Sequence, residues 1–350
     1  MRSFRRIMVT GGCGFIGCNF IRYLFEDVKF QGIVVNVDKL TYAANPYSLA
    51  DIQDRFKDRY IFIKADISEK DTMKSLFSEW KVDAICHFAA ESHVDRSILG
   101  PEDFLRTNVF GTYVLLECAR QLGEQFVLFH HVSTDEVFGS LDEGAFTEET
   151  PYRPSSPYSA TKAASDHLVR AYNKTYGLPV TISNCSNNYG PYQFPEKLIP
   201  LMILNAKEGK ELPVYGDGLN VRDWLYVKDH CEAIWLIMQK GGLGSTYNVG
   251  GGEELPNIKV VEKICDTLDE ILGNRNRRQL IRFVKDRPGH DRRYAMDISK
   301  INRELGWYPK ESFETGLRKT ILWYLDEEEW VKRVLTKEYM SWIEKNYGGR

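Results

Sequence analysis

This chain of 350 residues lacks the features of a membrane, secreted or nucleic-acid-binding protein. No apolar run approaches the length that crosses a bilayer. The first predicted strand begins within a few residues of Met1, which leaves no room for a signal peptide. The charges nearly cancel, with 46 Lys and Arg against 49 Asp and Glu and a net charge of −3, and no basic stripe indicates a nucleic-acid partner. We therefore expect a soluble, cytoplasmic protein without a membrane partner.

Paired cysteines are also absent. The seven cysteines are scattered, odd in number, and form no C-x-x-C pair; they stand at positions 13, 18, 86, 118, 185, 231 and 265. Neither a disulfide framework nor a zinc site is indicated. Several stand within apolar runs, where a free cysteine behaves as a small buried hydrophobe. We expect free thiols in a reducing compartment and no metal site.

What the chain does have is an alternation of short apolar runs with segments of helical period. Predicted strands cover residues 7–10, 33–37, 60–63, 84–88, 126–131 and 180–183, with helices at 71–80, 104–122 and 160–176. This order predicts an α/β fold with a doubly wound parallel sheet of the Rossmann type over residues 1–186. Hydrophobic residues make up 43% of the chain, enough for a full core.

The pattern becomes less regular after residue 186. Shorter strands are predicted at 212–215, 246–249 and 280–284, with helices at 198–208, 229–239, 258–272 and 313–325. We interpret residues 187–350 as a smaller mixed α/β lobe that binds substrate. No low-complexity linker separates the two parts, so later segments can return to the first domain.

A glycine-rich turn follows the first strand and opens a helix, with the sequence T-G-G-C-G-F-I-G from Thr10 to Gly17. In such a turn Gly11 allows the tight bend, Gly14 allows backbone N–H groups to approach a pyrophosphate, and Gly17 allows helix and sheet to pack closely. A glycine triplet alone is weak evidence. The order strand, turn, helix and second strand makes it a predicted dinucleotide site.

Acidic residues end the second and third strands. Asp38 can accept hydrogen bonds from ribose hydroxyls and would repel a 2′-phosphate, which favours NAD over NADP, although Lys39 beside it weakens that argument. Asp38 could instead be a turn residue only. Asp66 and Ile67 are candidates for the adenine edge. Small residues after Phe88 suit a backbone that a cofactor approaches.

Tyr158 and Lys162 lie one helical turn apart and share one face of a predicted helix. A nearby ammonium, together with a positive nicotinamide, is expected to lower the pKa of the tyrosine, so that its phenolate can take a hydroxyl proton during hydride transfer. The Y-x-x-x-K spacing is common on helix surfaces by itself. Its place in this strand order favours a catalytic pair.

Asp135 and Glu136 follow the predicted strand 126–131. Neighbours in a strand point to opposite faces, so both acids can serve one site only if the strand gives way to a turn. Ligands in open α/β sheets bind at the carboxyl ends of the strands, where this pair would lie. An acid and a base beside a Tyr/Lys pair predict an enzyme that oxidises a sugar transiently, eliminates water and reduces the product again.

These residues together resemble the extended short-chain dehydrogenase/reductase family, and the similarity runs nearly end to end. It covers the glycine turn, D-K-L-T-Y (38–42), A-A-E-S-H-V-D-R-S (89–97), S-T-D-E-V-F-G, Y-S-A-T-K, N-N-Y-G-P-Y (187–192), P-E-K-L-I-P (195–200), G-D-G-L-N-V-R-D-W (216–224), D-R-P-G-H-D-R-R-Y (286–294) and S-W-I-E-K-N-Y. The departures are Cys13, Cys18 and Phe138, where Ala, Ser and Tyr are commoner.

The resemblance implies a Rossmann fold, NAD as cofactor, a homodimer, and conversion of dTDP-glucose to dTDP-4-keto-6-deoxyglucose in deoxysugar synthesis. Tyr158, with Thr134 and Lys162, would remove the C4 hydroxyl proton. Glu136 would then take the C5 proton while Asp135 protonates the departing C6 hydroxyl. Helices 104–122 and 160–176 are apolar enough to form a two-helix contact from each subunit.

The resemblance also implies two sets of binding residues. Besides the glycines, Tyr158 and Lys162, the cofactor set is Phe15, Ile16, Asp38, Lys39, Leu40, Thr41, Asp66, Ile67, Phe88, Ala89, Ala90, Thr107 and Asn188. The substrate set is Ser92, Thr134, Asn187, Lys197, Leu198, Pro213, Val214, Tyr215, Arg222, Asn257, Asp286, Arg287, His290 and Tyr347.

The arginines near the C-terminal end allow two interpretations of their role. Arg275, Arg277, Arg278 and Arg282, and then Arg287, Arg292 and Arg293, form a cluster that either decorates a solvated face or binds an anion. A guanidinium matches phosphate oxygens, which favours a diphosphate at Arg222 and Arg287.

Two other functions remain as alternatives. One is a 4,6-dehydratase, epimerase or decarboxylase that acts on another nucleotide sugar such as UDP-glucose. The other is a non-catalytic NAD-binding regulator, which would be free to lose the Tyr/Lys pair that this chain retains.

Overall fold

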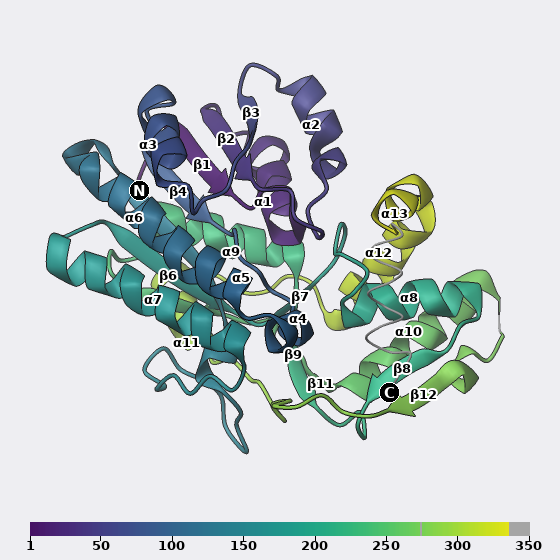
Figure 1. Cartoon of the computed structure of the whole chain (residues 1–350). Helices are drawn as coiled ribbons and strands as arrows, with labels where there is room; N and C mark the ends of the chain where they lie inside the picture. Colours follow the sequence, from purple (N-terminus) through teal and green to yellow (C-terminus); the bar gives the residue numbers. More distant parts are fainter. Residues whose placement is uncertain (274, 336–350) are drawn as a thin grey trace.

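The computed structural model describes residues 1–273 and 275–335 (Figure 1). Its largest element is a sheet of seven parallel strands in the order β10-β6-β5-β4-β1-β2-β3. The strands are β1 (Arg6–Thr10), β2 (Ile33–Asp38), β3 (Tyr60–Lys64), β4 (Ala84–His87), β5 (Leu128–Thr134), β6 (Val180–Cys185) and β10 (Thr246–Val249). The predicted doubly wound sheet is confirmed.

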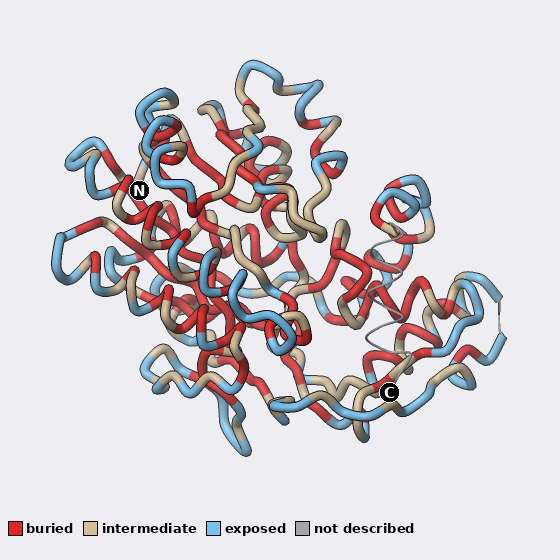
Figure 2. Tube along the Cα trace, viewed as in Figure 1, coloured by how far each residue is buried: buried red, intermediate tan, exposed pale blue. Residues whose placement is uncertain are grey.

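The pleat of the strands divides the core into two layers, one on each face of the sheet. Ile7 and Val9 of β1 pack with α1 (Phe15–Glu26), α2 (Ala50–Arg55) and α9 (Val227–Lys240), whereas Met8 packs on the other side. That second layer contains α3 (Lys70–Glu79), α6 (Thr112–Gln121) and α7 (Pro157–Tyr176). Figure 2 shows the buried strands between these outer helices. Because both faces are covered, the strands are apolar without alternation.

The chain returns to the large sheet late in its sequence. β10 pairs in parallel with β6, and α9 packs against α1. The sequence-based division listed these segments, as 246–249 and 229–239, with the smaller lobe but allowed later segments to return to the first domain, and β10 and α9 are such segments. A strand of four residues is too short for its sequence to show which sheet it will join. The division of the chain at residue 186 otherwise stays a prediction.

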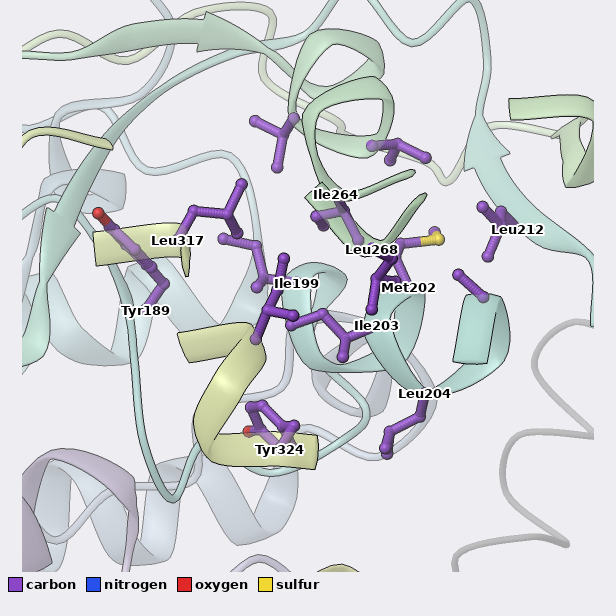
Figure 3. Close-up of a cluster of buried hydrophobic side chains, with 14 of the residues drawn as sticks. Tyr189, Ile199, Met202, Ile203, Leu204, Leu212, Ile264, Leu268, Leu317 and Tyr324 are labelled. Carbon is purple, nitrogen blue, oxygen red and sulfur yellow. The ribbon is translucent and has the colours of Figure 1, made fainter. Parts of the chain in front are cut away.

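The second lobe holds a core of its own (Figure 3). Apolar residues of α8 (Leu198–Glu208), α10 (Asn257–Leu272) and α12 (Phe313–Asp326) meet there, among them Ile203, Ile264 and Leu317. The two-stranded sheet β8 (Leu212–Tyr215) and β12 (Ile281–Val284) lies beside it. A three-stranded sheet of β7 (Asn187–Tyr189), β9 (Val221–Tyr226) and β11 (Glu254–Pro256) connects this lobe to the large sheet.

The predicted helix 104–122 is interrupted. It consists of the short α5 (Glu102–Phe104), a π-helical segment Leu105–Gly111 and α6. The π turn contains Thr107, a predicted cofactor residue, and π segments often occur at functional sites. The remaining elements are α4 (Val94–Leu99), α11 (Ser299–Leu305), α13 (Glu328–Val334) and the 3₁₀ turns Pro46–Leu49, Gly123–Gln125, Asp135–Phe138 and Arg277–Leu280.

All seven cysteines are buried free thiols, as the sequence predicts. Within residues 1–273 and 275–335, no helix combines the length and the apolar character needed to cross a bilayer.

Candidate active site

The carboxyl ends of β1, β2, β4, β5 and β6 surround a cavity of about 300 Å³. All predicted cofactor residues except Leu40 line it, and so do all five predicted catalytic residues. Of the predicted substrate residues, Ser92, Thr134, Asn187 and Lys197 line it. The sheet therefore brings side chains from distant parts of the sequence to one edge, as expected for an open α/β sheet.

The glycine turn is shaped by contacts that exclude a side chain. Gly11 has a φ of +71°, and a Cβ on it would lie 2.7 Å from the Cα of Ala89. A Cβ on Gly17 would lie 2.3 Å from the Gly11 carbonyl oxygen. A Cβ on Gly14 would meet the protein only at the Gly11 oxygen, 3.3 Å away, and Gly14 lines the cavity. A side chain there would thus fill the space over the start of α1.

The start of α1 suits an anion. Its first turn has no acidic residue, and no described side chain caps its backbone N–H groups. Such a helix start, with its positive end of the dipole exposed to a cavity, binds phosphate oxygens. The cradle of Gly14 and the uncapped N-terminus fit a dinucleotide pyrophosphate.

Asp38 closes the turn and also faces the cavity. Its carboxylate accepts hydrogen bonds from the backbone N–H groups of Cys13 (2.9 Å) and Leu40 (2.8 Å), and burial raises its pKa. The residue is therefore a turn residue and a candidate ribose ligand at once. Lys39 forms an ion pair with Asp66 (2.8 Å). Because Asp66 already neutralises the charge of Lys39, the argument that Lys39 would attract a 2′-phosphate is weakened.

Tyr158 and Lys162 are positioned by the start of α7. The helix begins with a capping box between Ser156 and Ser159, which fixes Tyr158 in the first turn. Lys162 is 5% exposed, and its Nζ donates a hydrogen bond to the carbonyl oxygen of Val132 (2.8 Å).

The pKa of Tyr158 depends on its surroundings in the folded protein. Burial raises it well above its usual value, with Glu136 adding to the rise, and a hydrogen bond with Thr134 opposes it. The lowering that the sequence predicts comes from Lys162 together with a positive nicotinamide, and it stays a prediction. Formation of the phenolate then depends on positive charge that a bound cofactor brings.

The strand β5 ends directly before the two acids, Asp135 and Glu136. Thr134 is its last residue, and Asp135 and Glu136 begin a 3₁₀ turn. Thr134 donates from its hydroxyl to Asp135 Oδ1 (3.2 Å) and accepts from the Glu136 backbone N–H (3.2 Å). The turn lets both neighbours line the same cavity, as the argument from strand geometry requires.

Their surroundings separate the two acids. Asp135 is 2% exposed, its Oδ2 has no partner among the described residues, and burial together with Glu136 raises its pKa well above the usual value. Burial also raises the pKa of Glu136, but Arg287, Lys197 and Arg222 oppose the rise. Unequal environments of this kind are what separate acid and base roles for two neighbouring carboxyls require.

Most of the other predicted substrate residues lie outside the cavity but are gathered by the second lobe. These are Leu198, Pro213, Val214, Tyr215, Arg222, Asn257, Asp286, Arg287 and His290. Pairing of β8 with β12 brings Tyr215 beside the segment 286–290, and the rings of Tyr215 and His290 lie 6.2 Å apart. Tyr347 lies outside the described residues.

Buried polar atoms without partners mark this region. Asn187 Oδ1, Asn257 Oδ1 and Arg287 Nε have no hydrogen-bond partner within the described chain. A buried polar group left unpaired is costly, so these atoms point to a ligand. Within the arginine cluster of the sequence, the members held in ion pairs differ from Arg287. Ion pairs with nearby carboxylates hold Arg277, Arg278, Arg282, Arg292 and Arg293, whereas the charge of Arg287 acts on Glu136.

Sequence reasoning missed several residues that line the cavity. They include Ala43, Ala44, Glu91, Cys185, Ser186, Gln193, Phe194 and Glu196. Cys185 and Ser186 could have been found, since they stand at the carboxyl end of the strand next to β5. The prediction ended that strand at residue 183, two residues before β6 ends.

A doubly wound parallel sheet, a glycine turn at a helix start and a Tyr/Lys pair beside it define an extended short-chain dehydrogenase/reductase. A family model described as GDP-mannose 4,6 dehydratase matches residues 8–320. The chain is 55% identical to dTDP-glucose 4,6-dehydratase of Shigella flexneri and 55% identical to dTDP-glucose 4,6-dehydratase 1 of Escherichia coli, each over 99% of both chains. It belongs to the dTDP-glucose 4,6-dehydratase family.

Solved structures agree with this assignment. The crystal structure of dTDP-glucose 4,6-dehydratase from Bacillus anthracis in complex with NAD has a TM-score of 0.85 and 47% identity, covering 94% of this chain and 99% of that one. The enzyme from Streptomyces venezuelae, also with NAD bound, has a TM-score of 0.88 and 46% identity over the same shares. UDP-glucose 4-epimerase of Thermotoga maritima is more distant, with 29% identity and a TM-score of 0.81.

Proposed function

We propose that this protein is an NAD-dependent dTDP-glucose 4,6-dehydratase, which converts dTDP-glucose to dTDP-4-keto-6-deoxyglucose and water. The observation that carries the proposal is the turn after β5, which places Asp135 and Glu136 in the same cavity as Tyr158 and Lys162. An enzyme that only oxidises or reduces a sugar needs Tyr158 and Lys162 alone. Asp135 and Glu136 add the acid and the base that elimination of water requires.

NAD would be held by the glycine turn, the start of α1 and Asp38, and when bound it supplies a reversible acceptor of hydride. The protein side chains move the protons. Tyr158, hydrogen-bonded to Thr134, takes the proton of the C4 hydroxyl during the first oxidation. Lys162 brings positive charge to the same end of the cavity.

Elimination follows from the acidity of C5 next to the new C4 ketone. Glu136 takes the C5 proton, and Asp135, which burial keeps protonated, gives a proton to the departing C6 oxygen. After the reduction of C6, Glu136 returns its proton to C5. The sum is loss of one water molecule without net oxidation. Tyr158 has then gained one proton and Asp135 has lost one, so the starting state is restored when Tyr158 releases its proton and Asp135 takes one up again.

For the nucleotide, the charges around Glu136 support a diphosphate. Arg222 and Arg287 carry fork-shaped cations suited to phosphate oxygens, and Lys197 supplies a third charge. The substrate-binding roles of Asn257, Asp286 and His290 are part of the proposal.

Incubation with dTDP-glucose tests the function. We expect release of a 4-keto sugar, seen as a chromophore on addition of alkali, without net formation of NADH. A parallel assay with UDP-glucose decides between this reading and a sibling enzyme for another nucleotide sugar, including an epimerase. If neither sugar is turned over but NAD binds, the protein is a non-catalytic NAD-binding regulator.

The homodimer is proposed on exposed apolar side chains along α4 to α7. Leu99, Leu105, Phe110 and Tyr176 are exposed, and α6 packs beside α7. Two such helices from each subunit would form a four-helix contact. Light scattering should show a dimer that Leu105→Glu converts to a monomer. Leu243→Glu is the matched control, because both leucines are 55% exposed. A dimer that survives Leu105→Glu contradicts this interface.

We also propose that the protein works in the cytoplasm. Seven buried free thiols suit a reducing compartment. Fractionation of the source cells, with the protein detected by antibody, tests this.

A further inference from the structure

Behind the catalytic cavity lies a buried carboxylate that the mechanism does not use. Asp166 on α7 is 0% exposed and does not line the cavity. It accepts hydrogen bonds from Ser133 Oγ (2.8 Å) and the Tyr152 hydroxyl (2.7 Å), and its Oδ1 lies 3.1 Å from His131 Nε2. Asn184 Nδ2 is a third donor, 3.4 Å from the Oδ2 that the two hydroxyls bond. The pKa of Asp166 is lowered despite burial, because these donors and the neighbouring His131 and Lys162 favour its ionised form.

Asp166 lies where it can act on both catalytic segments. It follows Lys162 by one helical turn, so the two side chains share a face of α7. Ser133, which donates to Asp166, stands between Val132, whose carbonyl oxygen binds Lys162, and Thr134. The carboxylate therefore ties the end of β5 to the helix that carries Tyr158.

In this region, one group can balance the positive charge of the buried Lys162 ammonium. The other titratable and charged groups that face Lys162 and Asp166 are His87 on β4, His131 on β5, Cys185 on β6, Tyr152 before α7, and Tyr158 and Arg170 on α7. Burial lowers the pKa of His87 and His131, the latter to about 4, and raises that of Cys185 to about 12. Burial raises the pKa of Tyr152 and Tyr158 as well.

At neutral pH these histidines, the cysteine and the tyrosines are uncharged, and Arg170 is positive. Of the groups named, Asp166 is thus the one negative charge that can offset the buried ammonium. A buried charge without such an offset is strongly disfavoured.

We propose that Asp166 is a positioning residue, a buried counter-ion that keeps the Lys162 side chain protonated and holds it against the end of β5. The proposal deepens the proposed function, because it explains how Lys162 stays a cation in the site where Tyr158 must lose a proton.

Competitive acetylation of the full-length protein over a range of pH, read by mass spectrometry of the Lys162 peptide, tests this without turnover. Lys162 lines the cavity, so a small reagent can reach it. We expect Asp166→Asn to lower the pKa of Lys162 by about one unit or more. Asp166→Glu, which keeps the charge, should restore most of it. Asp229→Asn, another buried carboxylate on α9, is the control and should leave it unchanged.

A folded Asp166→Asn protein in which Lys162 titrates as in the wild type overturns the proposal. If that variant does not fold, Asp166→Ser replaces it, since serine is neutral and smaller. Should both neutral variants fail to fold, the carboxylate serves the fold alone, and the proposal is again overturned.

Single-turnover kinetics supply the second readout. In Asp166→Asn, the fall in the rate of first oxidation at high pH should begin at lower pH, while KM for dTDP-glucose stays within about twofold, because Asp166 does not line the cavity. A uniform loss of rate at every pH contradicts a counter-ion role. If the wild type does not turn over dTDP-glucose, the proposed function fails, but the acetylation result still decides the role of Asp166.

Discussion

Lys162 Nζ donates a hydrogen bond to the carbonyl oxygen of Val132, over 2.8 Å. This bond joins the helix that carries Tyr158 to the strand that ends in Thr134. The two halves of the proposed chemistry, oxidation by Tyr158 and elimination by the acid pair, are therefore held in one frame. Each half can be disabled separately.

Glu136→Gln removes the proposed base and keeps the shape of the side chain. We expect the first oxidation to proceed and elimination to slow by about 10²- to 10⁴-fold. Bound NADH should then accumulate, and its near-ultraviolet absorbance measures the arrest. Normal turnover without accumulation would refute the assignment of Glu136.

Tyr158→Phe removes the hydroxyl that takes the C4 proton. The first oxidation itself should slow by about 10²- to 10⁴-fold, so no NADH accumulates after mixing with substrate. Stopped-flow absorbance separates this variant from Glu136→Gln. If Tyr158→Phe oxidises normally and is arrested later, the proposed order of steps is wrong.

Gly17→Ala tests the close packing under the glycine turn. The new Cβ would lie 2.3 Å from the Gly11 oxygen and 2.8 Å from the Gly12 Cα. Backbone must shift to admit it, which we expect to lower the free energy of unfolding by about 1–3 kcal/mol and to weaken NAD binding. Urea unfolding and NAD titration measure the two effects.

The control for Gly17→Ala is Gly100→Ala at the end of α4, where a Cβ meets nothing within 4 Å. It should change neither quantity appreciably. Equal effects of the two substitutions would mean that the contact at Gly17 does not matter.

Because His230 is buried with a lowered pKa, we expect the protein to lose stability in acid. It is buried on α9, its Nδ1 lies 2.9 Å from Asn188 Oδ1, and burial lowers its pKa to about 3. Below the unfolded value of about 6.5, the unfolded chain binds a proton that the folded protein does not. The contribution of His230 is therefore fully present above that pH and is lost as the pH falls towards about 3.

His230→Gln should remove this contribution to the pH dependence. Between about pH 7 and about pH 5, the free energy of unfolding of the wild type should fall by roughly 2 kcal/mol more than that of the variant. Urea unfolding at the two pH values measures the difference. The same fall in both proteins would show that His230 is protonated in the folded state.

Strand ends show where sequence reasoning reached its limit. The predicted strands end at His131 and Ser183, but β5 extends to Thr134 and β6 to Cys185. Of the added residues, Ser133, Thr134 and Asn184 are polar and nevertheless buried. Their partners come from elsewhere in the chain: Ser133 donates to Asp166, and Asn184 donates from Nδ2 to the Thr134 carbonyl oxygen (3.2 Å). Only the packed structure supplies such partners.

The proposed catalytic residues show the same division between local and long-range determinants. The spacing of Tyr158 and Lys162 and the adjacency of Asp135 and Glu136 are local, and helix and turn geometry carry them into the structure. The pKa of Tyr158 is not local in this sense, because burial and Glu136 raise it in the folded protein. The expected lowering by Lys162 together with a nicotinamide stays a prediction.

By itself, the amino-acid sequence determined the strand–helix alternation, the glycine turn and the spacing of the catalytic pairs, because each depends on contacts between near neighbours along the chain. Tertiary structure alone decided that β10 joins the large sheet, that Arg287 and Lys197 act on Glu136, and that Ser133 and Tyr152 bond to Asp166. Those relationships depend on how distant segments pack, and no local pattern encodes the distance between them.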